Sequence, residues 1–263
     1  ARLNYSYNNK YLATVSVRRD GSSLFGYSNP YATFPAAALG WVISEEKFFN
    51  VKFIDYLKLR ASWGVNGNRD IDNYAALSRI VADKSLNAEQ NGNYVIIPTL
   101  EINTMENRKL KWERTAAYNF ALDFRLLNGI LGGSLEIYSM STTDVLVNRK
   151  LPIITGFDRV YANLGEVKNK GVELSLNSTN IKNHNFEWTS NFIFSLNRDK
   201  IVSITGEKTD VFDSEGNLIG QKEVDDKDNG WFIGQSKDVI WDYKILGTWK
   251  TGQEEEAAKW NQQ

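Results

Sequence analysis

The sequence predicts an all-β fold, namely an antiparallel wall of a transmembrane β-barrel. Long segments alternate between apolar and polar residues, which gives each strand one apolar and one polar face. The connections also alternate in length, short at one end of the strands and long at the other, as in outer-membrane barrels. A soluble β-sandwich has no physical reason to sort its connections by length, so both observations favour the barrel.

The longest predicted hairpin covers residues 111–139. Even positions from Tyr118 to Leu126 are apolar, and Asn128-Gly129 supplies the positive φ angles of a tight turn before the chain returns. Each arm runs to about 14 residues, whereas soluble strands have about 5–6 and a tilted membrane strand needs about 9–11. This hairpin is therefore expected to cross a bilayer twice.

Four strands are expected before this hairpin, at residues 3–7, 11–17, 31–43 and 57–63. Pro35 cannot donate to a ladder, so it is expected at the beginning of its strand or at a bulge. The connection 44–55 is short, with one helical turn expected at Ser44–Phe49.

After the hairpin, strands are expected at 172–177, 186–196 and 239–251, followed by a helix at 253–263. Residues 66–110 and 201–238 show no sustained period and are expected to be long loops. About nine strands result, whereas bacterial single-chain barrels have even numbers. The whole chain, 1–263, is therefore expected to form part of the barrel domain of a larger protein.

The composition excludes several classes of function. A net charge of −1 gives no electrostatic footprint for nucleic acid, and the absence of cysteine excludes disulfides and thiolate metal sites. His184 is the only histidine and lies in a predicted polar turn, so with no second histidine we exclude a Ser-His-Asp triad and a histidine metal cluster within this chain. The acidic run Asp225–Gly230 resembles half a calcium loop, but Ser236 stands where the bidentate glutamate is required. We expect neither enzyme activity nor a cofactor or metal site.

Five blocks of sequence resemble one known family. They are Arg18–Ser23, Thr33–Glu46, Leu57–Asn68, Leu110–Phe124 and Asn163–Leu176, in the order found in SusC-like TonB-dependent outer-membrane transporters of the Bacteroidetes. The resemblance implies a 22-stranded barrel with an N-terminal plug, a SusD-like surface lipoprotein that acts as a lid, and energy delivered by TonB. The plug, the TonB box and the closing strands are expected to lie outside this chain.

The two faces of the predicted strands supply different candidate residues. Inward residues of a large barrel border water, and the lumen-facing candidates are Arg18, Arg60, Asn119, Asp123, Arg125, Glu136, Glu173 and Glu187. The lipid-facing candidates are Phe120, Leu122, Phe124, Phe192 and Phe194. Tryptophans near strand ends are expected in the aromatic belts at the membrane boundaries: Trp41, Trp63, Trp112 and Trp188.

Aromatic and charged residues in the long connections are candidates for contact with the lipoprotein or the substrate. They are Tyr74, Arg79, Tyr94, Phe157, Tyr161, Trp231 and Lys237.

The leading functional hypothesis is TonB-dependent import of oligomeric nutrients across the outer membrane, glycan fragments in preference to peptides, together with a SusD-like lipoprotein. A structural subunit of an outer-membrane assembly that has lost import is one alternative. A soluble carbohydrate-binding β-domain is another, and it would be soluble without detergent.

Overall fold

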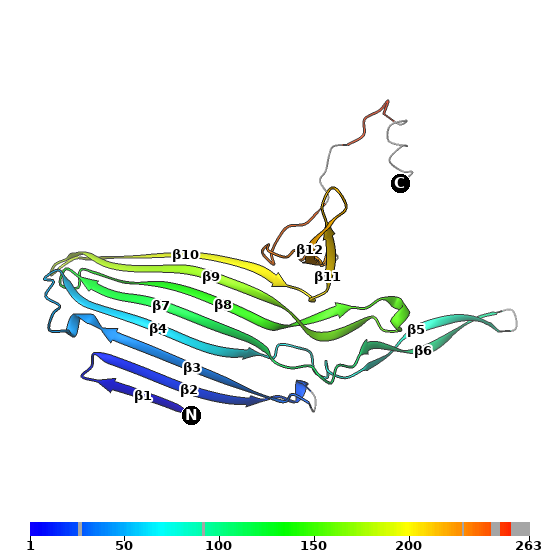
Figure 1. The fold of residues 1–263 in the computed structure, drawn as a ribbon, viewed down its shortest axis with the longest axis horizontal. Helices are drawn as coiled ribbons and strands as arrows, with labels where there is room; N and C mark the ends of the chain where they lie inside the picture. The colour runs from blue at the N-terminus through cyan, green and yellow to red at the C-terminus, as the bar shows by residue number, and fades with distance from the viewer. Residues whose placement is uncertain (26–27, 91–92, 228, 243–247, 254–263) are drawn as a thin grey trace.

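The structure, a computed structural model, describes residues 1–25, 28–90, 93–227, 229–242 and 248–253, with only the backbone described at 82–90, 93–99, 101 and 153. Eight long strands lie side by side as one antiparallel wall, in the order β1-β2-β3-β4-β7-β8-β9-β10 (Figure 1). Their bounds are β1 Arg2–Tyr7, β2 Tyr11–Gly21, β3 Tyr31–Val42, β4 Ile54–Asn68, β7 Glu113–Leu126, β8 Leu131–Lys150, β9 Arg159–Lys182 and β10 Glu187–Ser203. The predicted all-β fold class is confirmed.

The short turns gather at one end of the wall and the long connections at the other (Figure 1). We call these the turn end and the loop end. Within the described ranges, three short 3₁₀ helices accompany the strands: η1 Ser23–Phe25, η2 Ile43–Glu45 and η3 Ile153–Thr155. The helical turn expected at Ser44–Phe49 is confirmed only in part, because η2 begins one residue earlier and already ends at Glu45. None of the helices in the described part of the chain is long and apolar enough to cross a membrane.

Strand register gives the wall one face whose central rows are uncharged, here called the apolar face. One complete row across all eight strands is Tyr5, Ala13, Leu39, Ala61, Phe120, Ile137, Val172 and Leu196. The next row towards the turn end is Tyr7, Tyr11, Trp41, Leu59, Leu122, Leu135, Leu174 and Phe194. Large side chains stay uncovered on this face, among them Phe120, which is 60% exposed. The intervening residues form the opposite, polar face.

The expectation of a loop at 66–110 is wrong. Strands β5 (Arg79–Gln90) and β6 (Asn93–Met105) form an antiparallel hairpin that projects beyond the wall at the loop end (Figure 1). Its base is joined to the wall where Thr104 and Met105 pair in parallel with Arg159 and Val160. The sequence here lacks the regular alternation of the wall strands, and the element is defined by pairing between β5 and β6.

The region after residue 200 also differs from expectation. β10 continues to Ser203, and strands β11 (Lys208–Phe212) and β12 (Leu218–Glu223) form a separate two-stranded sheet inside the expected loop 201–238. The strand expected at 239–251 is absent from its described residues, 239–242 and 248–251, where the exposed Ile240 and Trp241 have no partner strand. The helix expected at 253–263 falls outside the described residues except for Gln253.

Two expectations about single residues are corrected where β3 and β4 separate. Their pairing ends at Ala36 and Gly64, so Pro35, the fifth residue of β3, is paired on one side only and needs no bulge. The space between the diverging strands is filled by a buried group, the loop-end cluster: Phe25, Phe34, Ala76, Leu110 and Trp112. Trp112 therefore lies in a core and not in an aromatic belt; it is only 6% exposed, with its ring centroid 5.1 Å from that of Phe25.

Candidate functional site

The polar face carries an ionic network centred on Arg60. Its Nε donates to Asp123 Oδ2 at 2.7 Å, and its Nη2 donates to Asp123 Oδ1 and Glu136 Oε1, each at 2.9 Å. Asn119 Nδ2 donates to the second carboxylate oxygen of Glu136 at 3.1 Å. These four side chains come from β4, β7 and β8, so the network joins three neighbouring strands.

Small residues on the middle strand make this long reach possible. Arg60 and Glu136 are both cross-strand partners of Ala121, whose methyl group leaves room for the guanidinium to pass over β7. The same arrangement recurs at Gly171, which lies in register between Tyr138 and Asn197 while Tyr138 Oη donates to Asn197 Oδ1 at 3.3 Å. A Cβ at Gly171 would collide with the Tyr138 ring.

The remaining lumen candidates have more local partners. Arg18 contacts Asp20 at 2.8 Å and lies over the Phe34 ring, and Arg125 lies over the Tyr56 ring. Glu187 pairs with Lys182 at 3.2 Å. Glu173 lies directly opposite Glu136, so two carboxylates face each other beside the positive charge of Arg60. The carboxylate oxygens of Asp123 and Glu136 stay partly accessible and can accept further hydrogen bonds from hydroxyl or amide groups.

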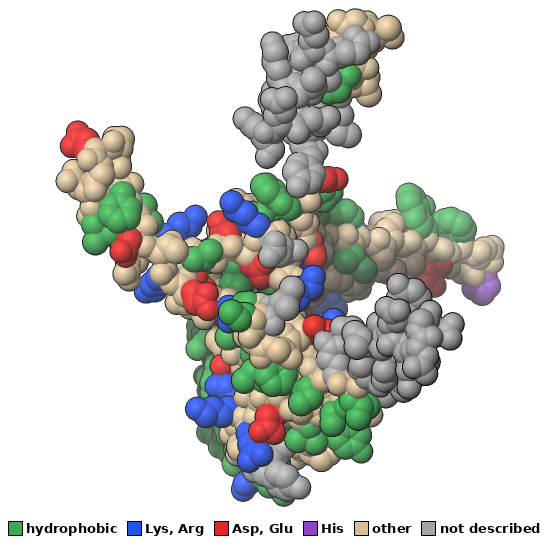
Figure 2. Space-filling view, turned by 90° about the vertical axis from the view of Figure 1, so that its right-hand side faces the viewer, with side chains coloured by type: hydrophobic (Ala, Val, Ile, Leu, Met, Phe, Trp, Pro, Cys, Tyr) green, Lys and Arg blue, Asp and Glu red, His purple; other side chains and the backbone are tan. Residues whose placement is uncertain are grey.

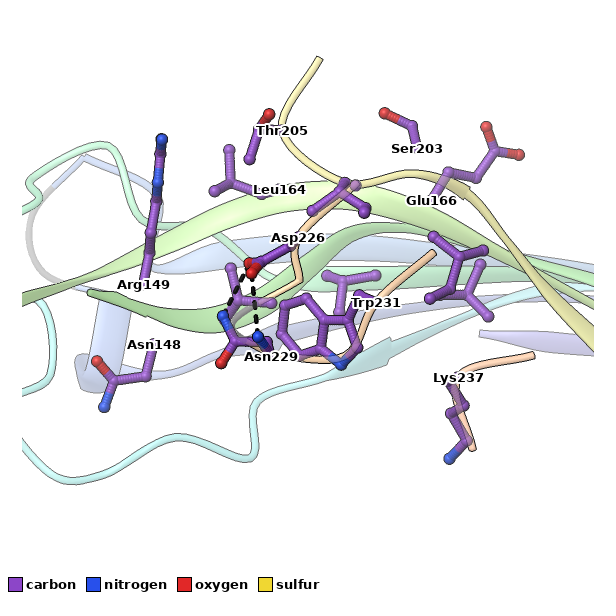
Figure 3. Close-up of a pocket in the computed structure, with 16 residues that line it drawn as sticks. Asn148, Arg149, Leu164, Glu166, Ser203, Thr205, Asp226, Asn229, Trp231 and Lys237 are labelled. Atoms are coloured by element: carbon purple, nitrogen blue, oxygen red, sulfur yellow. Dashed lines mark hydrogen bonds between the residues drawn. The ribbon is translucent and has the colours of Figure 1, made fainter. Parts of the chain in front are cut away.

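A small apolar cavity of about 170 Å³ lies at the loop end, between the ends of β8, β9 and β10 and the segment 225–237. Its lining includes Val167 and Ile201. It also includes Leu164 and Trp231, which are labelled in Figure 3. The segment is fixed along β10, because Gly234 N donates to Ile201 O and Ile201 N donates to Gln235 O, each at 2.8 Å.

Polar contacts hold Trp231 in place at this cavity. Asp226 and Trp231 exchange backbone hydrogen bonds of 2.9 and 2.8 Å, and the Asp226 carboxylate accepts from Asn229 N and Nδ2, as the dashed lines in Figure 3 show. Asp225 accepts from Ile233 N at 2.8 Å. The acidic run that resembles half a calcium loop thus uses its carboxylates to shape the segment.

Glu223, at the end of β12, is a structural anchor that sequence reasoning missed. Its Oε1 accepts from Ile204 N, Thr205 N, Gly206 N and Ser203 Oγ at 2.6–3.0 Å. Burial tends to raise the pKa of this carboxyl, but the four hydrogen bonds outweigh burial and hold the pKa below its usual range. Residues 203–206 have no sequence motif that announces such a set of donors.

The loop candidates fall into two places at the loop end, where side chains of both charges are exposed (Figure 2). Near the base of the β5–β6 hairpin, Tyr161 Oη donates to Asp72 Oδ2 at 2.7 Å, while Tyr74 is 72% exposed. Arg79 begins β5, and Phe157 precedes β9. Trp231 and Lys237 line the cavity instead. The side chain of Tyr94 lies outside the described residues.

Comparison with known proteins gives consistent matches. The family model described as "TonB dependent receptor-like, beta-barrel" matches residues 1–235. Among curated proteins, TonB-dependent receptor P26 of Formosa agariphila is 37% identical over 259 residues, 98% of this chain and 25% of that protein. TonB-dependent receptor SusC of Bacteroides thetaiotaomicron is 36% identical over 224 residues, 84% of this chain and 22% of that protein.

Solved structures show the same likeness. A structure titled "Structure of the RagAB peptide transporter" aligns with a TM-score of 0.69 and 30% identity, over 78% of this chain and 22% of that one. The RagAB peptide importer in the "open-open" state aligns with a TM-score of 0.70 and 28% identity, over 89% of this chain and 24% of that one. The chain thus spans about a quarter of the length of the proteins that it matches.

Proposed function

Because this chain belongs to the TonB-dependent receptor-like β-barrel family and is SusC-like, we propose that it forms part of the wall of an outer-membrane importer of oligomeric nutrients. The family is one of outer-membrane transporters and not of enzymes. The observation that carries the proposal is the two-faced wall, with two complete rows of uncharged residues on one side and the Arg60 network on the other. The apolar face would contact lipid, and the polar face would line a wet conduit.

We place the lumen candidates in that conduit because they share the polar face. A conduit for oligomers has to offer hydrogen bonds without holding a substrate tightly. Carboxylates and amides that are already paired, such as Glu136 and Asn119, offer weak contacts of this kind. Glycan fragments are the preferred substrate class in this proposal, since hydroxyl groups match such acceptors, and oligopeptides are the second candidate because RagAB is titled a peptide transporter.

A SusD-like surface lipoprotein is the proposed partner, seated at the loop end, and TonB would act through a segment outside this chain. Support comes from the similarity to SusC and RagAB and from the projecting β5–β6 hairpin with exposed Tyr74 at its base. The cavity beside Trp231 lies at the same end and would be accessible from outside the cell.

The test uses the full-length protein in its native host. Deleting it should abolish growth on one oligomeric glycan while growth on the corresponding monosaccharide is unchanged, and the purified complex should bind that oligomer. Growth defects restricted to peptide media would overturn the glycan preference but keep import. Normal uptake of every oligomer, together with loss of an envelope assembly, would overturn import and favour the structural subunit.

A further inference from the structure

Four basic residues lie on the apolar face at its loop-end border. Arg198 on β10 is directly opposite Lys170 on β9, and Lys200 is directly opposite Lys168. They continue the alternation that places Leu196 and Val172 on the apolar face, so each strand passes straight from apolar residues to cations. We call Lys168, Lys170, Arg198 and Lys200 the basic border.

This arrangement is unfavourable for the protein alone. Directly opposite residues in an antiparallel pair have Cβ atoms about 4.5–5.5 Å apart, and like charges there are destabilising. One acid compensates in part, since Glu166 pairs with Lys168 at 3.2 Å and also accepts from Ser141 Oγ. Among the described residues, no ion pair joins the other three cations to an acid. The basic border therefore has an excess of positive charge that an external anion would neutralise.

The same charge pattern continues along the wall. On β7, Arg114 follows Ala116 towards the loop end, and on β2, Arg19 follows Val17. At the opposite edge of the apolar face, the next outward residues of β9 and β10 are the uncharged pair Ser178 and Ser190. The cations on this face thus mark one border of the apolar region and not both.

We propose that the basic border binds the phosphate groups of lipid headgroups in the leaflet at the loop end. The uncharged rows beside it would contact the acyl chains of the same lipids. Long lysine and arginine stems can follow an apolar surface while their charged ends reach the headgroup layer. Ammonium and guanidinium groups are the protein's usual partners for phosphate oxygens. This inference rests on the membrane placement in the proposed function, and it adds a lipid site to it.

The test uses the full-length protein in nanodiscs of phosphatidylcholine containing a minor share of phosphatidic acid. Native mass spectrometry would count the phosphatidic acid molecules retained on wild type, on K170Q/R198Q and on a matched control, K47Q/K52Q, which removes two cations from the 43–53 connection at the turn end. Since each basic residue near an anionic surface contributes severalfold, K170Q/R198Q should lower retention by on the order of tenfold. The control should retain as much as wild type.

Further arms separate the possible outcomes. The charge-keeping variant K170R/R198K should behave as wild type, which distinguishes charge from packing even if K170Q/R198Q assembles poorly. Equal retention by wild type and K170Q/R198Q would overturn the inference while leaving import intact. Displacement of the lipid by millimolar inorganic phosphate would also overturn it, because the site would then bind free phosphate. If wild type takes up no oligomer but retains the lipid as expected, only the proposed import function is overturned.

Discussion

At the residue scale, Arg60 on β4 is the shared cation that joins Asp123 on β7 and Glu136 on β8. Replacing it with alanine leaves Asp123 and Glu136 without their shared cation, while Glu173 still faces Glu136. Charge-assisted hydrogen bonds contribute about 1.5–3 kcal/mol each, but the Arg60 side chain is 38% exposed, so we expect a net loss of only about 1–2 kcal/mol. Urea unfolding of the full-length protein in detergent, followed by electrophoretic band shift, measures the change.

Arg18 provides the control for Arg60. Its side chain is 62% exposed and, among the described residues, contacts Asp20 and the Phe34 ring, so R18A should change the unfolding midpoint far less. Equal midpoints for R60A and R18A would show that the network adds nothing beyond a surface ion pair.

We expect the attachment of β12 to residues 203–206 through Glu223 to depend on pH. Because its folded pKa lies below the unfolded value, the attachment is fully stabilised above about pH 4.3 and is lost as pH falls through the lowered folded value. Hydrogen exchange at the amides of Ile204, Thr205 and Gly206, corrected for intrinsic rate, should show protection that falls with acid.

E223Q tests the cause of that protection. A neutral amide accepts hydrogen bonds more weakly than a carboxylate, so E223Q should lower protection at neutral pH and remove its acid dependence. Identical exchange in E223Q and wild type at pH 7 would mean that these donors are protected by something other than Glu223.

At the scale of the element, β7 offers a matched pair of neighbouring positions on opposite faces. Phe120 lies in an uncharged row, and Asn119 lies in the Arg60 network. Arginine at a lipid-facing midplane position of a barrel costs about 2–4 kcal/mol, so F120R should impair assembly in the membrane. N119R should be much milder, since Glu136 is within reach. Assembly is measured by heat-modifiable mobility; loss in N119R alone would invert the assignment of faces.

The β5–β6 hairpin can be shortened without cutting the wall. Lys84 and Thr99 are directly opposite each other, so replacing residues 85–98 with Asn-Gly should close a shorter hairpin with a tight turn. The base stays fixed by the pairing of Thr104 and Met105 with β9. We expect normal barrel assembly and weaker co-purification of the proposed surface lipoprotein. Full retention of the lipoprotein would show that it binds to other loops.

Elements with one continuous apolar face could be predicted from the sequence. Period-2 alternation placed β7 and the turn-end part of β10 correctly, because one face carries an unbroken apolar run from Tyr118 to Leu126 in β7 and from Phe192 to Leu196 in β10. The β5–β6 hairpin and the β11–β12 sheet were not predicted, because backbone pairing between two neighbouring strands does not by itself require alternating apolar residues. The segment 239–251 has apolar residues, but pattern alone cannot supply a partner strand.

At the scale of the whole molecule, the candidate site was predictable by face but not by contact. Alternation assigned Arg60, Asp123 and Glu136 to one side of the wall, and the structure joins them. That they meet depends on register and on the small residue Ala121 between them, which no local signal specifies. Trp112 was misplaced for the same kind of reason, since its burial depends on where β3 and β4 separate.

The loop-end cluster gives the molecule two regions that respond to different solvents. Phe25 and Leu110 are completely shielded, and unfolding would expose them to water with a rise in heat capacity. In the proposed membrane placement, the side chains of the apolar face remain in hydrocarbon and make no such contribution to the heat capacity. Calorimetry should therefore resolve the melting of the loop end as a separate transition with a positive heat-capacity change. The stability of the loop end should change on cooling and with chaotropes. The stability of the wall should depend instead on the choice of detergent.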